Sequence, residues 1–148
     1  TKEAKDNVLQ NIEHITEMFN IKQLGTEEDL AFMALATAGD ERAVPILSKI
    51  LLEYTEPVGE RDPISLPAEV QARKDAAQYL GEIGDDSVIP ALKQAALKDK
   101  NAEVRKSALF SLKSIAQQDS LETLKQALND PDEKVRSTAK ELIDSLKD

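Results

Sequence analysis

Three clusters of carboxylate side chains come closest, by residue type and spacing, to a site for a metal cation. They lie at residues 27–29, 56–62 and 130–133. The acids in 56–62 do not have the spacing of a calcium-binding loop. The other two clusters fall at predicted helix N-termini and turns, where capping and the helix dipole already favour acidic side chains. We therefore predict no metal site.

Side chains for nucleophilic or cofactor chemistry are equally scarce. The chain has no Cys and a single His, His14, which lies among polar residues of an amphipathic segment. It contains no Gly-rich phosphate loop, no paired-His motif and no Ser-containing nucleophile elbow. The sequence therefore predicts a protein that is not an enzyme, with no catalytic residue and no cofactor.

The charge balance limits the classes of partner. The 148 residues include 28 Asp and Glu against 19 Lys and Arg, a net charge of -9, and only 3% are aromatic. Such a chain repels phosphate backbones and anionic lipid, and no apolar run approaches the roughly 18 residues of a membrane span. We expect a protein or peptide partner rather than nucleic acid or membrane. Thr1 in place of Met indicates a trimmed or processed chain. The sequence favours a cytoplasmic monomer or weak homodimer, with a piece of a larger chain as an alternative.

A short motif is written three times, and its spacing predicts the architecture. The copies are Ala72-Arg73-Lys74-Asp75-Ala76, Val104-Arg105-Lys106-Ser107-Ala108 and Val135-Arg136-Ser137-Thr138-Ala139. They start 32 and 31 residues apart, a period typical of stacked helical hairpins. A second match, Gly39–Leu47 with Gly84–Leu92, is offset by 45 because a Pro- and Gly-containing segment at 53–66 interrupts the unit. We predict that segment to be an inserted loop.

Apolar residues recur at helical spacing, whereas strand-like alternation is not sustained. Helices are expected at about 3–20, 26–38, 40–52, 67–83, 86–98, 102–117, 119–129 and 132–147. The prediction is one all-α domain, residues 1–148, built as an open right-handed stack of about four hairpins and eight helices. Residues 1–38 would form an N-terminal capping hairpin. The expected core is Leu35, Leu47, Ile50, Leu80, Ile83, Leu92, Leu112, Ile115, Leu124, Leu128 and Leu142.

The repeat unit resembles the HEAT repeats, in particular the short phycobilisome-lyase-like subclass. The resemblance rests on Gly84-Asp85…Pro90, Asp99…Val104-Arg105…Ala108 and Asp130…Val135-Arg136…Ala139, and it covers residues 27–148. It implies an α–α superhelix in which the motif Arg residues bond the motif Asp residues across neighbouring repeats. Arg73, Arg105 and Arg136 would thus be structural, paired with Asp99 and Asp130. The first hairpin has Glu27-Glu28 in place of Val-Arg, as a terminal unit often does.

The same resemblance implies that the second helix of each hairpin lines a concave groove. Residues flanking the Val-Arg-x-x-Ala frame would point into that groove, Glu103 among them. The partner-binding residues we select are Asp29, Leu30, Met33, Lys74, Asp75, Gln78, Lys106, Ser107, Phe110, Ser137 and Glu141. Phe110 is apolar where its counterparts are Gln78 and Glu141, so it is either an anchor for a partner or packed beneath an adjacent loop or helix.

Three functions follow as hypotheses. The first is a non-catalytic scaffold that binds a peptide or protein segment in the groove, with function carried by side chains on a rigid stack. The second, implied by the resemblance, is an accessory or lyase-like protein of the phycobilin-lyase class, although no specific catalytic residue matches. The third is nucleic-acid processing, which would need a basic groove, whereas Lys74 and Lys106 are offset by Asp29, Asp75 and Glu141.

Overall fold

The computed structural model describes residues 41–53 and 68–147, and no strand occurs in these two ranges. The helices are α3 (Val44–Glu53), α4 (Ala68–Ile83), α5 (Ile89–Lys98), α6 (Ala102–Ala116), α7 (Leu121–Ala127) and α8 (Glu133–Leu146). Short 3-10 turns at Glu41–Ala43, Asp86–Val88 and Gln117–Ser120 lead into α3, α5 and α7. The all-α prediction is therefore confirmed for the described part of the chain.

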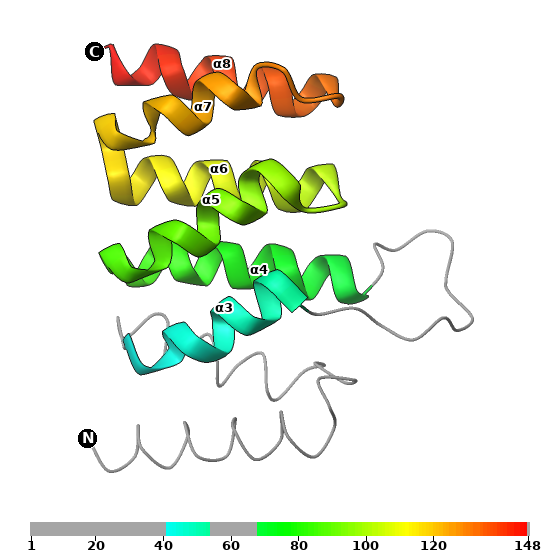
Figure 1. Ribbon diagram of the computed structural model, residues 1–148, viewed down its shortest axis with the longest axis vertical. Coiled ribbons are helices and arrows are strands. Elements are labelled where there is room, and N and C mark those ends of the chain that lie inside the picture. The colour runs from blue at the N-terminus through cyan, green and yellow to red at the C-terminus, as the bar shows by residue number, and fades with distance from the viewer. Residues whose placement is uncertain (1–40, 54–67, 148) are drawn as a thin grey trace.

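The helices form a stack of hairpins in two layers (Figure 1). Within the hairpins, α3 packs on α4, α5 on α6 and α7 on α8. Between hairpins, α6 lies against both α4 and α8, while α5 contacts α3 and α7. The second helices thus make one layer and the first helices make the other, nearer the viewer in Figure 1. Each hairpin buries its apolar side against its neighbours, as the repeat spacing predicts.

Helices α3 to α8 lie where the sequence places them, with differences at their ends. The helices expected from residues 86 and 119 open with 3-10 turns before α5 and α7. Pro90 suits the first turn of α5, because that turn has no use for its missing N–H. Glu53, expected in the inserted loop, is the last residue of α3. The helices expected at 3–20 and 26–38, which would form the 1–38 capping hairpin, and the rest of the 53–66 loop lie outside the described residues.

Short polar side chains start the helices and glycine ends one of them. Asp85, Asn101 and Asp132 each accept hydrogen bonds from backbone amides of the first turn that follows. Gly84 has a φ of +72° and its N–H donates to the Leu80 carbonyl at 3.2 Å, a left-handed stop that glycine adopts without strain. The amide of Ser87 holds the pKa of Asp85 below its usual 3.8, helped by the Ser87 hydroxyl and Glu41. The predicted end of α4 and cap before α5 at Gly84-Asp85 are confirmed.

The core repeats one set of positions in every hairpin. In the first-helix layer, Leu47, Leu92 and Leu124 occupy the same place and are almost fully buried. In the second-helix layer the repeated buried position is a small residue, which lets the helices approach closely. The residues at this position are Ala76, Ala108 and Ala139. Burying each Leu contributes about 1.5–3 kcal/mol relative to leaving it in water. Most of the expected core is thus confirmed. Ile83 and Ile115 are partly buried against it, and Leu35 lies outside the described residues.

Leu128 was wrongly assigned to the core, since it is 39% exposed. In the repeat frame it matches Leu51 and Ala96, which are both buried. Those two residues belong to helices that have another helix of the same layer beyond them, α5 and α7 respectively. In the described residues, α7 has no such neighbour on its outer side. The periodic position is therefore correct for Leu128, but nothing covers it.

Buried ion pairs join successive hairpins. The guanidinium of Arg73 bonds the Asp99 carboxylate from Nε at 3.0 Å and Nη2 at 3.2 Å. Arg105 bonds Asp130 in the same way, and its Nη1 also donates to the Asp99 carbonyl at 2.8 Å. The predicted structural role of these two Arg residues is confirmed. Arg136 instead donates from Nη1 to the Asp130 carbonyl at 2.7 Å, within its own hairpin.

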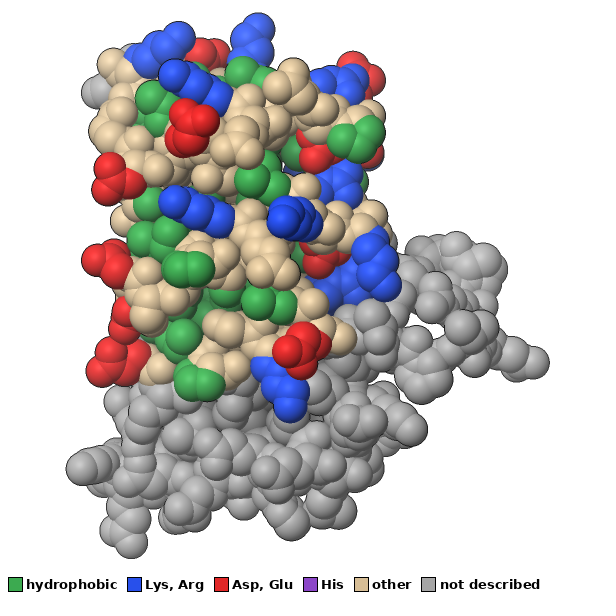
Figure 2. All heavy atoms as spheres, viewed as in Figure 1, with side chains coloured by type: hydrophobic (Ala, Val, Ile, Leu, Met, Phe, Trp, Pro, Cys, Tyr) green, Lys and Arg blue, Asp and Glu red, His purple; other side chains and the backbone are tan. Residues whose placement is uncertain are grey.

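The face formed by α3, α5 and α7 carries charges of both signs. Figure 2 views this face and shows Lys, Arg, Asp and Glu side chains dispersed among apolar and neutral ones.

None of the helices in the described ranges has the length and apolar character needed to span a bilayer. Within the same ranges, no group of three or more His, Cys, Asp or Glu side chains is placed to hold a metal ion.

Candidate functional site

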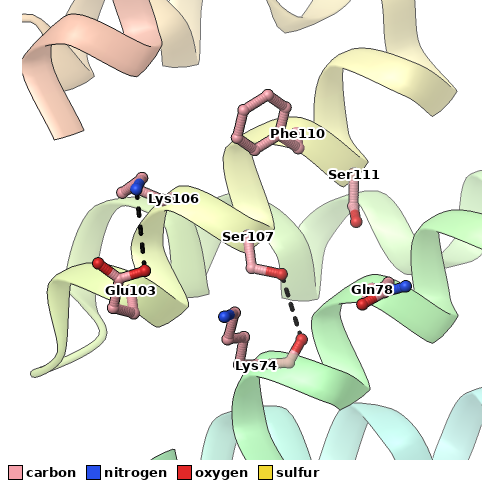
Figure 3. Close-up of a pocket in the computed structure, with 7 residues that line it drawn as sticks. All are labelled: Lys74, Gln78, Glu103, Lys106, Ser107, Phe110 and Ser111. Carbon is pink, nitrogen blue, oxygen red and sulfur yellow. Dashed lines mark hydrogen bonds and ion pairs between the residues drawn. The ribbon is translucent and has the colours of Figure 1, made fainter. Parts of the chain in front are cut away.

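A hollow of about 360 Å³ opens between α4 and α6 in the second-helix layer. Its lining residues, drawn in Figure 3, are Lys74, Gln78, Glu103, Lys106, Ser107, Phe110 and Ser111. Lys74 and Gln78 come from α4 and the others from α6. We call this site the α4–α6 hollow. Its volume is at the lower end of the range typical of ligand-binding pockets.

Helical spacing explains why these side chains meet. Lys74 and Gln78 are four residues apart, so they lie one above the other on the same face of α4. On α6, Glu103, Lys106 or Ser107, and Phe110 recur every three or four residues and therefore share a face as well. Since α4 and α6 pack side by side, their two faces border one hollow (Figure 3).

Two serine hydroxyls tie the helices together beneath the hollow. Ser107 Oγ donates to the Lys74 carbonyl at 3.2 Å, and the buried Ser111 Oγ donates to the Ala77 carbonyl at 2.7 Å. A β-carbon added at Gly81 would lie 2.4 Å from Ser111 Oγ, which is too close for any real contact. Gly81 therefore permits the close approach of α4 and α6 that forms the floor of the site.

Charged side chains of opposite sign border the hollow unevenly. The Lys106 ammonium lies 3.8 Å from the Glu103 carboxylate, a long and partly solvated pair (Figure 3). The Lys74 ammonium has no carboxylate partner among the described residues. Two lysines therefore face one glutamate, and the hollow is locally cationic on a chain whose net charge is -9.

Phe110 stands at the rim of the hollow with half of its surface exposed, at 50%. Burial beneath an adjacent loop or helix, one of the two possibilities left open by the sequence, does not agree with this exposure. The ring is the only large aromatic among the exposed hydrophobic residues of the described ranges, which otherwise are Leu52 and Leu128.

The structure brings together five of the selected groove residues, namely Lys74, Gln78, Lys106, Ser107 and Phe110. Asp75 lies beside them on α4 but does not line the hollow, and its carboxylate accepts from Gln71 Nε2 at 2.8 Å. Ser137 and Glu141 are exposed on α8 and do not line it either. Asp29, Leu30 and Met33 lie outside the described residues.

Two lining residues were not selected from the sequence. Glu103 was recognised as groove-facing but not chosen, while Ser111 was missed altogether. The repeat frame aligns Ser111 with Tyr79 and Leu142, both buried, so the position reads as core. Two features of the sequence could have indicated that Ser111 lines the hollow. It follows Ser107 by four residues, so the two hydroxyls share a face of α6, and α4 carries a glycine, Gly81, at the point of contact.

A family model described as HEAT repeats matches residues 67–144, more than half of the chain and all of α4 to α7. A search of curated proteins found no match.

Proposed function

Because the chain belongs to the HEAT-repeat family, we propose that it is a non-catalytic interaction module that binds a peptide or protein segment along its second-helix layer. Stacked helical repeats commonly serve as scaffolds for protein interactions, since they present a long rigid surface. The complete domain would be an open right-handed superhelix of about four hairpins. The observation that carries the proposal is the half-exposed ring of Phe110 at the rim of the α4–α6 hollow.

An exposed aromatic at this position has no structural purpose in the repeat. Its counterparts are Gln78 on α4 and Glu141 on α8, and both are exposed polar residues. The frame therefore folds without an apolar side chain here. Aromatic side chains set in a pocket are the residues that most often supply the binding energy of protein interfaces, which supports a role for Phe110 as an anchor.

The polar groups of the hollow support binding rather than catalysis. Both serine hydroxyls donate to backbone carbonyls of α4, so neither is oriented by a general base. The lysines and Glu103 border the rim, and the hollow has no His or Cys. For the same reason we place an interaction function ahead of the lyase-like alternative, for which the hollow offers no specific chemistry. The chain would act as a monomer that recruits a protein partner.

The test is a selection of peptides on the full chain. A library of random 12-residue peptides is panned on the wild-type protein, with removal of those that also bind the Phe110→Ala variant. We expect enriched peptides whose dissociation constants, measured by calorimetry, rise about thirtyfold in Phe110→Ala, since truncating a buried anchor commonly costs about 2 kcal/mol.

A matched control is Leu52→Ala, which removes a similarly exposed apolar side chain from α3 in the other layer. It should leave peptide affinity unchanged. Thermal unfolding of Phe110→Ala should match the wild type, because an exposed side chain supports little of the core. A selection in which no peptide survives the removal of Phe110→Ala binders would overturn the proposal.

A further inference from the structure

Lys74 places an ammonium group in the α4–α6 hollow, and none of the described carboxylates pairs with it. Its backbone carbonyl accepts from Ser107, but its Nζ is within ion-pair distance of no described carboxylate. Figure 3 places the Lys74 side chain between the two helices, below Ser107 and on the side of Glu103. The other lysine that lines the hollow, Lys106, already interacts with Glu103. The hollow therefore has one positive charge that its own residues do not neutralise.

The acidic residues next to Lys74 and Gln78 along α4 are held by glutamine amides. Gln71 Nε2 donates to Asp75 at 2.8 Å, and Gln78 Nε2 donates to Glu82 at 3.2 Å. Both bonds run along the exposed side of the helix. One of the two Gln78 amide hydrogens is engaged with Glu82, so toward a ligand Gln78 keeps its carbonyl oxygen as an acceptor and its second amide hydrogen as a donor.

The donors and acceptors of the hollow are consequently divided. The serine hydroxyls donate to α4, so toward the hollow their oxygens offer acceptors, while Gln78 offers its carbonyl oxygen as an acceptor and one amide hydrogen as a donor. Lys74 offers N–H donors with positive charge. A carboxylate satisfies Lys74 with a charge-assisted hydrogen bond, whereas a cationic ligand would face two lysines and only one glutamate. A backbone N–H next to that carboxylate in the ligand would donate a hydrogen bond to the Gln78 carbonyl oxygen.

The rest of the chain restricts how acidic such a ligand can be. With a net charge of -9, the protein repels a long run of acidic residues at a distance. Attraction at Lys74 is local and falls off within about a Debye length, roughly 8 Å at physiological salt. A single carboxylate flanked by apolar residues gains the local attraction with the least long-range repulsion.

We propose that the α4–α6 hollow recognises a partner segment that carries one carboxylate next to an apolar side chain, with Lys74 binding the carboxylate and Phe110 contacting the apolar group. This inference rests on the proposed function and specifies the chemistry of the partner. Lys74 is then the residue that determines specificity, and Phe110 supplies the apolar contact.

The experiment uses the Phe110-dependent peptides selected on the wild-type chain. Each is synthesised with its Asp or Glu and with the matching Asn or Gln, and both forms are titrated into wild type, Lys74→Met and Lys74→Arg. Methionine keeps the apolar stem and removes the charge. We expect the carboxylate peptide to bind Lys74→Met about tenfold more weakly, and the amide peptide to bind both proteins equally weakly. Lys74→Arg should retain most of the affinity.

Lys93→Met is the matched control, because it removes an exposed lysine from α5 in the opposite layer. It should not change the affinity for either peptide. If Phe110-dependent peptides lack a carboxylate, or bind Lys74→Met as tightly as wild type, the inference is wrong while the proposed function stands. If no Phe110-dependent peptide is selected, the proposed function fails and the inference fails with it.

Discussion

The guanidinium of Arg105 holds the carboxylate of Asp130 at two points, with Nε to Oδ2 at 2.8 Å and Nη2 to Oδ1 at 2.9 Å. The two residues belong to successive hairpins and are both largely buried. Asp130 Oδ1 also accepts the amide of Asp132, so the same carboxylate shapes the turn before α8. One interaction thus fixes a neighbouring repeat and the local backbone together.

Removing one partner of this pair should be costly. Arg105→Met leaves the Asp130 carboxylate buried without its counter-charge, and we expect a loss of about 3–5 kcal/mol in the free energy of unfolding. Urea denaturation followed by circular dichroism measures it. Arg136→Met is the control, since it loses only a bond from the guanidinium to a backbone carbonyl, worth about 1.5–3 kcal/mol, and leaves no carboxylate without its counter-charge. Equal losses in the two variants would contradict the role given to the Arg105–Asp130 pair.

Gly81→Ala should destabilise the contact between α4 and α6. The new methyl group would overlap Ser111 Oγ and Cβ, so the helices must separate or Ser111 must lose its bond to Ala77. We expect a loss of about 1–3 kcal/mol, typical of overpacking. In the Gly81→Ala/Ser111→Gly double variant, the loss should be smaller than the sum of the two single losses. Additive effects would mean that the two positions do not contact each other.

Lys140 should keep the outer face of α8 from associating. It occupies the position of Ala77 in α4 and Leu109 in α6, which are fully buried against the next hairpin, whereas Lys140 is exposed. Lys140→Leu would add a second exposed Leu to the last hairpin, which already exposes Leu128, and we expect concentration-dependent dimers by light scattering. Lys134→Leu, which alters another exposed lysine of α8, should have the same oligomeric state as the wild type. If both variants dimerise, any added surface leucine causes association, and Lys140 has no specific role.

Asp85 should make the free energy of unfolding depend on pH in the range below 3.8, the usual pKa of an Asp carboxyl group. The bond from the Ser87 amide lowers the pKa of Asp85 in the folded state below 3.8, so the unfolded chain binds the proton more readily. The stabilising contribution is therefore fully present above pH 3.8 and is lost as the pH falls through the folded-state pKa. Melting temperatures of wild type and Asp85→Asn, measured from pH 6 to 2.5, should differ more at the upper end. A constant difference would exclude ionisation as the cause.

The sequence predicted the features that every repeat shares. It did not predict the features that depend on one specific contact between two helices. Motif spacing located the hairpins and the Arg–Asp pairs because every unit repeats them. Helical offsets also placed Lys74, Gln78, Lys106, Ser107 and Phe110 on groove-facing sides. The closeness of α4 and α6 could not be read from either helix alone, since it depends on Gly81 meeting a residue thirty positions later.

Leu128 and Ser111 are the two instructive differences. For Leu128, the pattern of its own helix is correct, but burial depends on whether another helix follows in the same layer. For Ser111, alignment with Tyr79 and Leu142 indicated a buried position, which is true, yet it also borders the hollow. Exposure is a property of the assembled stack, and a local pattern determines only the direction in which a side chain points.

The two Arg–Asp pairs of the described residues run in the same direction along the stack, from the second helix of one hairpin to the end of the first helix of the next. The α5–α6 hairpin therefore offers an acceptor, Asp99, to the hairpin before it and a donor, Arg105, to the hairpin after it. An extra copy of such a unit, inserted in phase, would preserve every pairing on either side. Because the Arg–Asp pairing is the same at both junctions, one hairpin can follow another through an equivalent interface. The stack can therefore lengthen by duplication of a hairpin without requiring a new type of interface.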